Sequence, residues 1–205
     1  MNNPKLIISI ILIGFFVFFQ KESFGQSMDS AAFSIKVLGI SIGEMKVSKT
    51  SSLDQKEIYN LHSQVSFWFF GKIYLDHQIN CIFQEGQYVF STVDSKTNKG
   101  DFLSKIEWKE DHYQVNANTY KYENQKPIDY SIYSSISELY FQKPKVGDVI
   151  ISETYGLTSP VKEIEPDVFE ITINGHKNHF YYLDGVLDKV MIENPIKNFI
   201  MQRIY

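Results

Sequence analysis

Two histidines that lie close together, His176 and His179, are the first residues whose type and spacing suggest chemistry. Imidazole nitrogens bind Zn²⁺, and a nearby carboxylate such as that of Asp184 can complete a ligand set. Residues three apart in a strand point to opposite faces, so this pair shares a metal only if the Asn174-Gly175 turn extends through it. The other interpretation of His176 and His179 is that they are simply two polar residues around a hairpin turn. The pair is therefore a weak metal candidate, and we predict no cofactor.

Other groups with catalytic potential lack a supporting pattern. Cys81 lies between Ile79 and Phe83 on the apolar side of an alternating segment, which favours a small core residue over a reactive thiolate. His62 and His77 fall on opposite faces of their segments, and we interpret both as rim or surface residues. No GxSxG motif is present. Sequence cannot supply the carboxyl separation that glycoside hydrolysis needs. The carboxylates considered for it are Glu44, Asp76, Glu107, Asp129 and Glu153.

Two glycines, Gly39 and Gly43, suggest a phosphate-binding loop within FSIKVLGISIGEMKV. Such a loop requires a helix directly after the glycines, whose amide groups point at the anion. Here EMKV alternates apolar and polar residues, which predicts another strand. We therefore assign both glycines to backbone geometry and expect valine at either position to lower stability before it affects binding.

The N-terminus predicts export. The uncharged run from Leu6 to Phe19 is shorter than the ~20 residues that span a bilayer, and small residues, Ser23 and Gly25, precede a cleavage point ahead of Gln26. We predict a signal peptide over residues 1–25 and a single β-rich domain over 26–205, periplasmic or secreted, with no transmembrane segment after cleavage. An uncleaved anchor is the alternative.

Bulk composition narrows the function classes. The net charge is −4 and lysines are scattered, so a nucleic-acid partner is not expected. A single cysteine excludes an internal disulfide. The 16 Phe and 13 Tyr favour sheets, and several aromatics exceed what one core needs, so that they could also line a cavity or stack on sugars.

Two long alternating segments give the clearest structural prediction. Residues 57–70 and 73–83 read as strands of a hairpin, because apolar side chains recur at every second position. The inward side chains would either wall a ligand cavity or fill a core. They are Leu61, Val65, Phe67, Leu75, Ile79 and Phe83.

Further alternating segments extend to the C-terminus, with turns predicted at Asn174-Gly175 and Asp184-Gly185. PIDYSIY (residues 127–133) also reads as a strand. SSISELYF (residues 134–141) is the best candidate for a short helix. The predicted fold is therefore all-β: an antiparallel β-barrel or strongly curved sheet of about a dozen strands, with at most one or two short helices.

Four segments in order carry a family resemblance: FSIKVLGISIGEMKV, SELYFQKPK, SETYG and NHFYYLDGVLDKVMI. Together they resemble an exported bacterial family, domain of unknown function 6134, and the first also resembles domain of unknown function 3108. The resemblance implies an envelope or secreted β-rich domain without assigned activity or catalytic residues.

Three functions follow as hypotheses. The first is a non-catalytic envelope binding module for a small apolar, lipid or glycan ligand. The second is a structural or accessory subunit that binds another envelope protein by a sheet edge or an aromatic patch. The third is an envelope hydrolase, which ranks last because no two of its candidate groups are tied together by spacing.

Overall fold

The computed structural model describes residues 27–68, 72–193 and 198–205. The predicted signal peptide lies outside these residues, as does Gly71 in the predicted turn of the long hairpin. The described strands are β1 (Ser27–Val37), β2 (Ile40–Ser51), β3 (Lys56–Trp68), β4 (Lys72–Gln84), β5 (Gln87–Thr97), β6 (Gly100–Lys109), β7 (His112–Thr119), β8 (Tyr122–Asn124), β9 (Val149–Ser152), β10 (Leu157–Pro160), β11 (Lys162–Glu165), β12 (Val168–Ile173), β13 (His176–Leu183), β14 (Val186–Ile192) and β15 (Phe199–Ile204).

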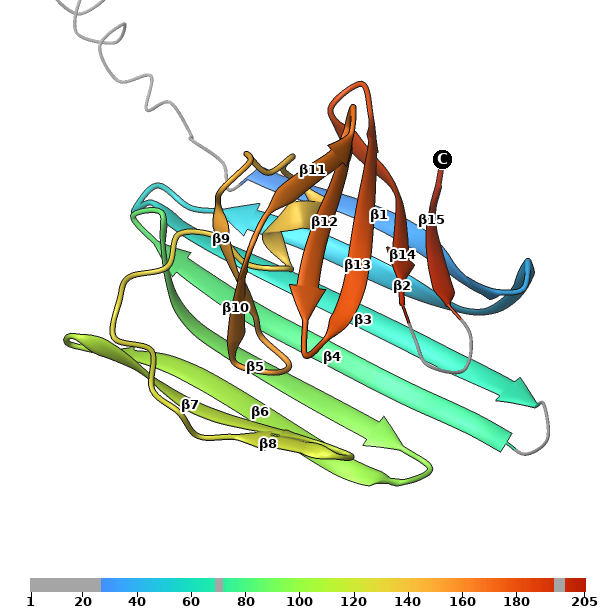
Figure 1. Ribbon diagram of the computed structural model, residues 1–205, viewed down its shortest axis with the longest axis horizontal. Helices are drawn as coiled ribbons and strands as arrows, with labels where there is room; N and C mark the ends of the chain where they lie inside the picture. The colour runs from blue at the N-terminus through green and yellow to red at the C-terminus, as the bar shows by residue number, and fades with distance from the viewer. Residues whose placement is uncertain (1–26, 69–71, 194–197) are drawn as a thin grey trace, which may run out of the picture.

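One antiparallel sheet dominates the molecule. Strands β1 to β8 follow one another as neighbours, and β15 pairs with the free side of β1, so that the chain order β11 to β15 continues the same sheet. Figure 1 shows β12, β13 and β14 crossing in front of the sheet formed by β2 to β5. Strands β9 and β10 form a separate two-stranded sheet.

The predicted all-β antiparallel fold is confirmed, but the sheet does not close into a barrel. Its terminal strands in the described chain are β11 and β8, and these do not pair with each other. The expected helix at residues 134–141 is a single 3₁₀ turn, η2 (Glu138–Tyr140). Residues 127–133 form no strand: Ile128 makes an isolated bridge with Tyr113, and the Ile132 carbonyl oxygen accepts a hydrogen bond of 2.9 Å from the Tyr88 N–H.

The η2 segment packs between the two halves of the curled sheet. Leu139 and Tyr140 are buried, and the Tyr140 ring meets the Phe33 ring edge-on with centroids 5.3 Å apart. From the other half, the Tyr182 hydroxyl donates a hydrogen bond of 2.7 Å to the Leu139 carbonyl oxygen. The Tyr140 hydroxyl points to the Met201 sulfur at 3.5 Å. This segment therefore contacts β1, β13 and β15, of which β1 and β13 do not pair with each other.

The two N-terminal glycines serve backbone geometry in different ways. Gly39 has a φ of +81° and follows Leu38 at +51°, as a two-residue hairpin turn requires. Gly43 lies beside a register shift between β1 and β2, and a Cβ atom there would come within 2.1 Å of the Gln64 carbonyl oxygen. The constraint at Gly43 is therefore contact with backbone, whereas that at Gly39 is conformation.

We predict that Gly43→Val lowers the free energy of unfolding by about 3 kcal/mol, because the sheet must open to admit the side chain. Gly39→Val should cost about 1–2 kcal/mol, from left-handed backbone alone. Chemical denaturation measures both, with Ser41→Val on the exposed part of β2 as the control. Unchanged unfolding in both glycine variants would contradict this assignment.

Candidate functional site

The inner face of β3, β4 and β5 carries the side chains that the sequence assigned to a cavity or core. This name denotes the face that is covered by η2 and the C-terminal strands. The predicted residues all point to it: Leu61, Val65, Ile79 and Phe83 are buried, whereas Phe67 and Leu75 are partly buried against the core. The alternation therefore gave the correct face for every one of them.

Burial changes along the strands of this face. At one end, Tyr59, Phe83 and Tyr88 are almost completely buried, and the Phe83 ring meets the Tyr59 and Tyr88 rings edge-on. Toward the other end, Phe67 and Leu75 retain exposed surface, and Ile73 is 46% exposed. We call these the buried end and the exposed end. The buried end is filled by the chain itself, because the Phe141 ring beside η2 lies 5.7 Å from the Tyr59 ring.

Three polar side chains lie together on the inner face, between the two ends. Ser63 on β3, His77 on β4 and Ser95 on β5 are directly opposite one another in the strand register. The His77 Nδ1 and Ser95 Oγ atoms share a hydrogen bond of 2.7 Å. His77, interpreted from sequence as a rim or surface residue, therefore lies partly buried on the inner face. Its position in the alternation, two residues from both Leu75 and Ile79, already indicated the inner face.

His77 suits hydrogen bonding better than proton transfer. Its ring keeps part of its surface exposed, yet burial lowers its pKa to about 4, so the imidazole is neutral at neutral pH. A general base works best with a pKa near the working pH, and a value of about 4 makes His77 a poor acceptor of the Ser95 proton. The polar trio Ser63, His77 and Ser95 can therefore recognise a neutral or weakly polar group on an otherwise apolar face.

A second polar cluster is sealed in the core. The Ser137 backbone N–H donates to the Glu153 carboxyl at 3.0 Å, and the Cys81 sulfur lies 3.6 Å from the Ser135 hydroxyl. Cys81 and Glu153 are both buried, and burial raises the pKa of the Cys81 thiol and of the Glu153 carboxyl. A thiol held neutral and away from solvent is a poor nucleophile, so this cluster is structural.

The opposite, outer face of the same strands is polar. A groove of about 690 Å³ crosses β1 to β5; amides, hydroxyls and one charge of each sign line it together with six apolar residues, Leu61 and Ile79 among them. The Asn80 amide donates to the Asn60 amide oxygen at 2.8 Å. The polar side chains that line it are Ser30, Lys46, Ser48, Asn60, His62, Gln78, Asn80, Thr92 and Asp94.

One carboxylate, that of Asp76, organises the outer face next to this groove. The Gln64 and Gln78 amides and the His62 ring each contact it at 3.1 Å. Hydrogen bonds, first from Gln64 and then from Gln78, lower the pKa of Asp76. His62 thus lies at the surface, as predicted. The Asp76 carboxylate is occupied by these three partners. The Glu107 carboxylate pairs with Lys105 and Lys109 instead, so Asp76 and Glu107, two of the carboxylates considered for glycoside hydrolysis, form no catalytic pair.

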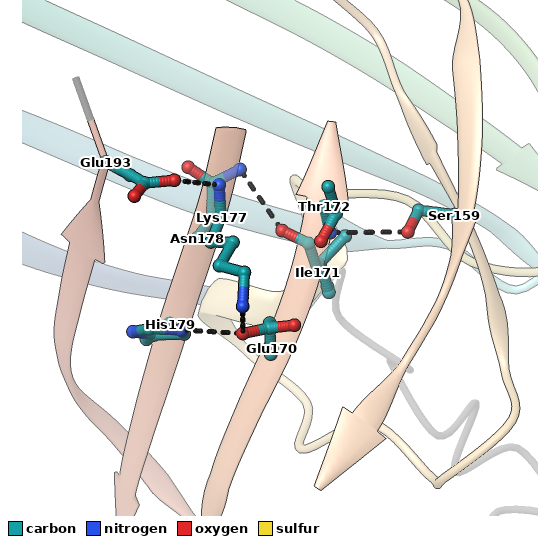
Figure 2. Close-up of polar contacts among 8 residues, drawn as sticks. All are labelled: Ser159, Glu170, Ile171, Thr172, Lys177, Asn178, His179 and Glu193. Atoms are coloured by element: carbon teal, nitrogen blue, oxygen red, sulfur yellow. Dashed lines mark hydrogen bonds and ion pairs between the residues drawn. The ribbon is translucent and has the colours of Figure 1, made fainter. Parts of the chain in front are cut away.

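The weak metal candidates separate in the structure. Asp184 occupies the β13–β14 turn and is not a partner of His179. The His179 ring instead contacts the Glu170 carboxylate at 3.1 Å, and the Lys177 ammonium binds the same oxygen at 3.1 Å (Figure 2). These contacts, the His179 hydrogen bond first, lower the pKa of Glu170. His176 opposes Ile173 at the start of the hairpin. Across the described residues, no three histidine, cysteine or acidic side chains gather to hold a metal ion.

Comparison with known proteins concerns family and fold. A family model described as Domain of unknown function (DUF6134) matches residues 33–204. A β-barrel-like protein of domain of unknown function DUF1849 from Brucella abortus has a similar structure, with a TM-score of 0.50 and 10% sequence identity over 85% of this chain and 95% of that protein. At this identity the likeness shows the fold alone. No curated protein matches the sequence. The predicted relation to domain of unknown function 3108 stays a prediction.

We predict that Glu153→Gln flattens the pH dependence of stability. Because the pKa of Glu153 is raised in the folded state, its contribution is complete below the unfolded pKa and is lost as pH rises through the folded pKa. Each unit of that rise corresponds to about 1.4 kcal/mol. Urea denaturation between pH 4 and pH 9 measures the difference between variant and wild type. Parallel curves for the two proteins would show that Glu153 is not buried as an acid.

Proposed function

The chain belongs to the family described as Domain of unknown function (DUF6134), and we propose that it is a non-catalytic binding module of the cell envelope. Its ligand is an amphiphile whose apolar chain lies on the exposed end of the inner face. The observation that carries this proposal is the change in burial along β3 and β4, from side chains covered by the chain itself to apolar side chains that keep free surface.

The inner face offers an apolar strip of suitable length. Val65 and Phe67 on β3 lie opposite Leu75 and Ile73 on β4. From Ser63 to Phe67, β3 spans about 13 Å at ~3.3 Å per residue, which matches a short extended hydrocarbon chain better than a compact ligand. Phe67, Leu75 and Ile73 keep exposed surface, and its burial by a ligand would contribute about 25 cal/mol for each Å² of apolar surface covered.

The polar trio supplies a place for the head of such a molecule. Ser63, His77 and Ser95 are aligned across three strands, and His77 carries no charge at neutral pH. Hydroxyls and a neutral imidazole both donate and accept hydrogen bonds, so they fit a protonated carboxyl, hydroxyl or ester group. The export predicted from residues 1–25 would bring the protein to the compartment where envelope lipids are exchanged.

A glycan is the second candidate ligand, and it belongs to the outer groove. Amides and hydroxyls there can donate and accept hydrogen bonds with sugar hydroxyls, and the lining charges, Lys46 and Asp94, offset each other. The apolar inner strip does not fit such a ligand. The two candidates therefore predict binding on opposite faces of the same sheet.

The experiment is native mass spectrometry of protein purified from its own envelope, followed by titration with the apolar dye 1-N-phenylnaphthylamine and displacement by oleate. We expect a retained amphiphile, dye binding, and loss of at least about tenfold in affinity for Leu75→Trp, which fills the strip. Ile82→Trp, on the outer side of β4, is the matched control and should bind as wild type.

A further variant separates the two parts of the site. His77→Leu should retain dye affinity and lose affinity for oleate, because it removes only the polar recognition. Melting temperatures of all three variants report whether each one is folded. Protein without a retained ligand, together with wild-type dye binding by a folded Leu75→Trp variant, would exclude the inner face as a binding site.

A further inference from the structure

We infer that the amphiphile bound on the inner face is a glycolipid, whose sugar ring packs in a corner between the aromatic rings of Phe102 and Tyr120. This assignment rests on the proposed function, which places an apolar chain on β3 and β4, and it specifies the class of head group. Phe102 lies on β6 and Tyr120 in the turn between β7 and β8, on the side of the sheet that ends at β8. Both side chains keep exposed surface.

The strand register places Phe102 beside the polar trio. The row of Ser63, His77 and Ser95 crosses β3, β4 and β5, and Ser95 is directly opposite Phe102 on β6. Side chains directly opposite on neighbouring strands share a face, so the Phe102 ring belongs to the inner face. Neighbouring strands are ~4.8 Å apart, which is close to the width of a sugar ring. A sugar on the Phe102 ring therefore brings its hydroxyls to Ser95 and His77.

The surface of the Phe102 ring is open toward the apolar strip. The next inner-face position on β6 is Gly100, where an added Cβ atom would lie 3.4 Å from the Phe102 ring. Gly100 is opposite Thr97, and Thr97 is opposite Leu75 of the strip. Figure 1 shows β6, β7 and β8 beside the strands that β12 to β14 cross, and not behind them. A chain on the strip and a sugar on Phe102 can therefore belong to one molecule.

Tyr120 forms the second side of the corner. Its ring is 53% exposed and stands at 69° to the Phe102 ring, with centroids 6.2 Å apart. The face of an aromatic ring carries partial negative charge, so the C–H groups on one side of a sugar pack on Phe102 while Tyr120 flanks them. The Lys121 ammonium, 5.3 Å from the centre of the Tyr120 ring, and the Tyr120 hydroxyl can hydrogen-bond to sugar hydroxyls at the rim.

This combination of groups favours a sugar over other heads. A pyranose has an apolar C–H side, which matches the aromatic corner, and a rim of hydroxyls, which matches the polar trio. A carboxylate or phosphate head has no such apolar side, and His77 offers it no charge at neutral pH. A glycan without an apolar chain would leave the strip uncovered. A glycolipid is the class of ligand that uses the strip, the trio and the corner together.

Two detergents with the same dodecyl chain test the head group. Dodecyl β-D-glucoside has a sugar head, whereas dodecyl tri(ethylene glycol) ether has an uncharged head without a ring. Both are titrated by calorimetry, below their micelle concentrations, into delipidated protein purified from its own envelope. We expect the glucoside to bind at least about tenfold more tightly. Phe102→Leu keeps an apolar side chain without an aromatic face, so it should lose about fivefold in glucoside affinity and bind the ether as wild type.

Matched variants locate the two parts of the ligand. Leu103→Ala, next to Phe102 on the outer side of β6, should bind both detergents as wild type. Tyr120→Leu should weaken glucoside binding alone, whereas Tyr133→Leu, at an exposed tyrosine between residues 127 and 133, should change neither affinity. Leu75→Trp should weaken both detergents, because it fills the strip that holds the chain. Melting temperatures report whether each variant is folded.

Equal affinities of the wild type for the two detergents would overturn the sugar assignment, as would unchanged glucoside affinity in a folded Phe102→Leu variant. Either result leaves the proposed function intact, because the ether still reports binding of an apolar chain. If neither detergent binds, the proposed function and the sugar assignment are both overturned.

Discussion

Packing of η2 between the two halves of the sheet is the interaction on which the rest of the structure depends. Strand β15 hydrogen-bonds to β1, but β8 and β11 do not close the sheet in the described chain, so packing is needed to hold the C-terminal strands over the N-terminal ones. Leu139, Tyr140 and the hydrogen bond from Tyr182 supply that packing. Truncation of a buried aromatic side chain costs about 3–5 kcal/mol, a large share of the stability of a single domain.

Because η2 and Phe141 fill one end of the inner face, the two ends of that face differ in burial. Tyr59, Phe83 and Tyr88 pack against each other and need no ligand, while the same strands continue to apolar residues that the chain covers only in part. The Glu153 carboxyl and the Cys81 thiol lie in the core, away from solvent. In the proposed function, the binding surface lies at the end of the inner face that the core leaves exposed. Among described residues, no helix is long and apolar enough to cross a bilayer.

Much of this architecture follows from the sequence. Alternation over β3 and β4 identified the inward side chains, and Asn174-Gly175 and Asp184-Gly185 form turns with positive φ, as their residue types require. The same rule placed His77 inside, but its polarity suggested the surface, because a single sequence does not show that Ser63 and Ser95 lie opposite it. Register between strands is set by packing, and packing also determines that the Glu153 side chain is buried. Residues 134–141 contain helix-forming signals, yet the space between the sheet halves admits a single 3₁₀ turn.

Occupancy of the inner face is tested most directly by NMR of the protein with a fatty acid that carries a nitroxide on its acyl chain. Paramagnetic broadening should reach the amide signals of Val65, Leu75 and Ser95 and leave those of Tyr59, Phe83 and Tyr88 sharp. Broadening confined to Asn60, Asn80 and the rest of the outer groove, or equal broadening at both ends of the inner face, would contradict the proposed binding surface.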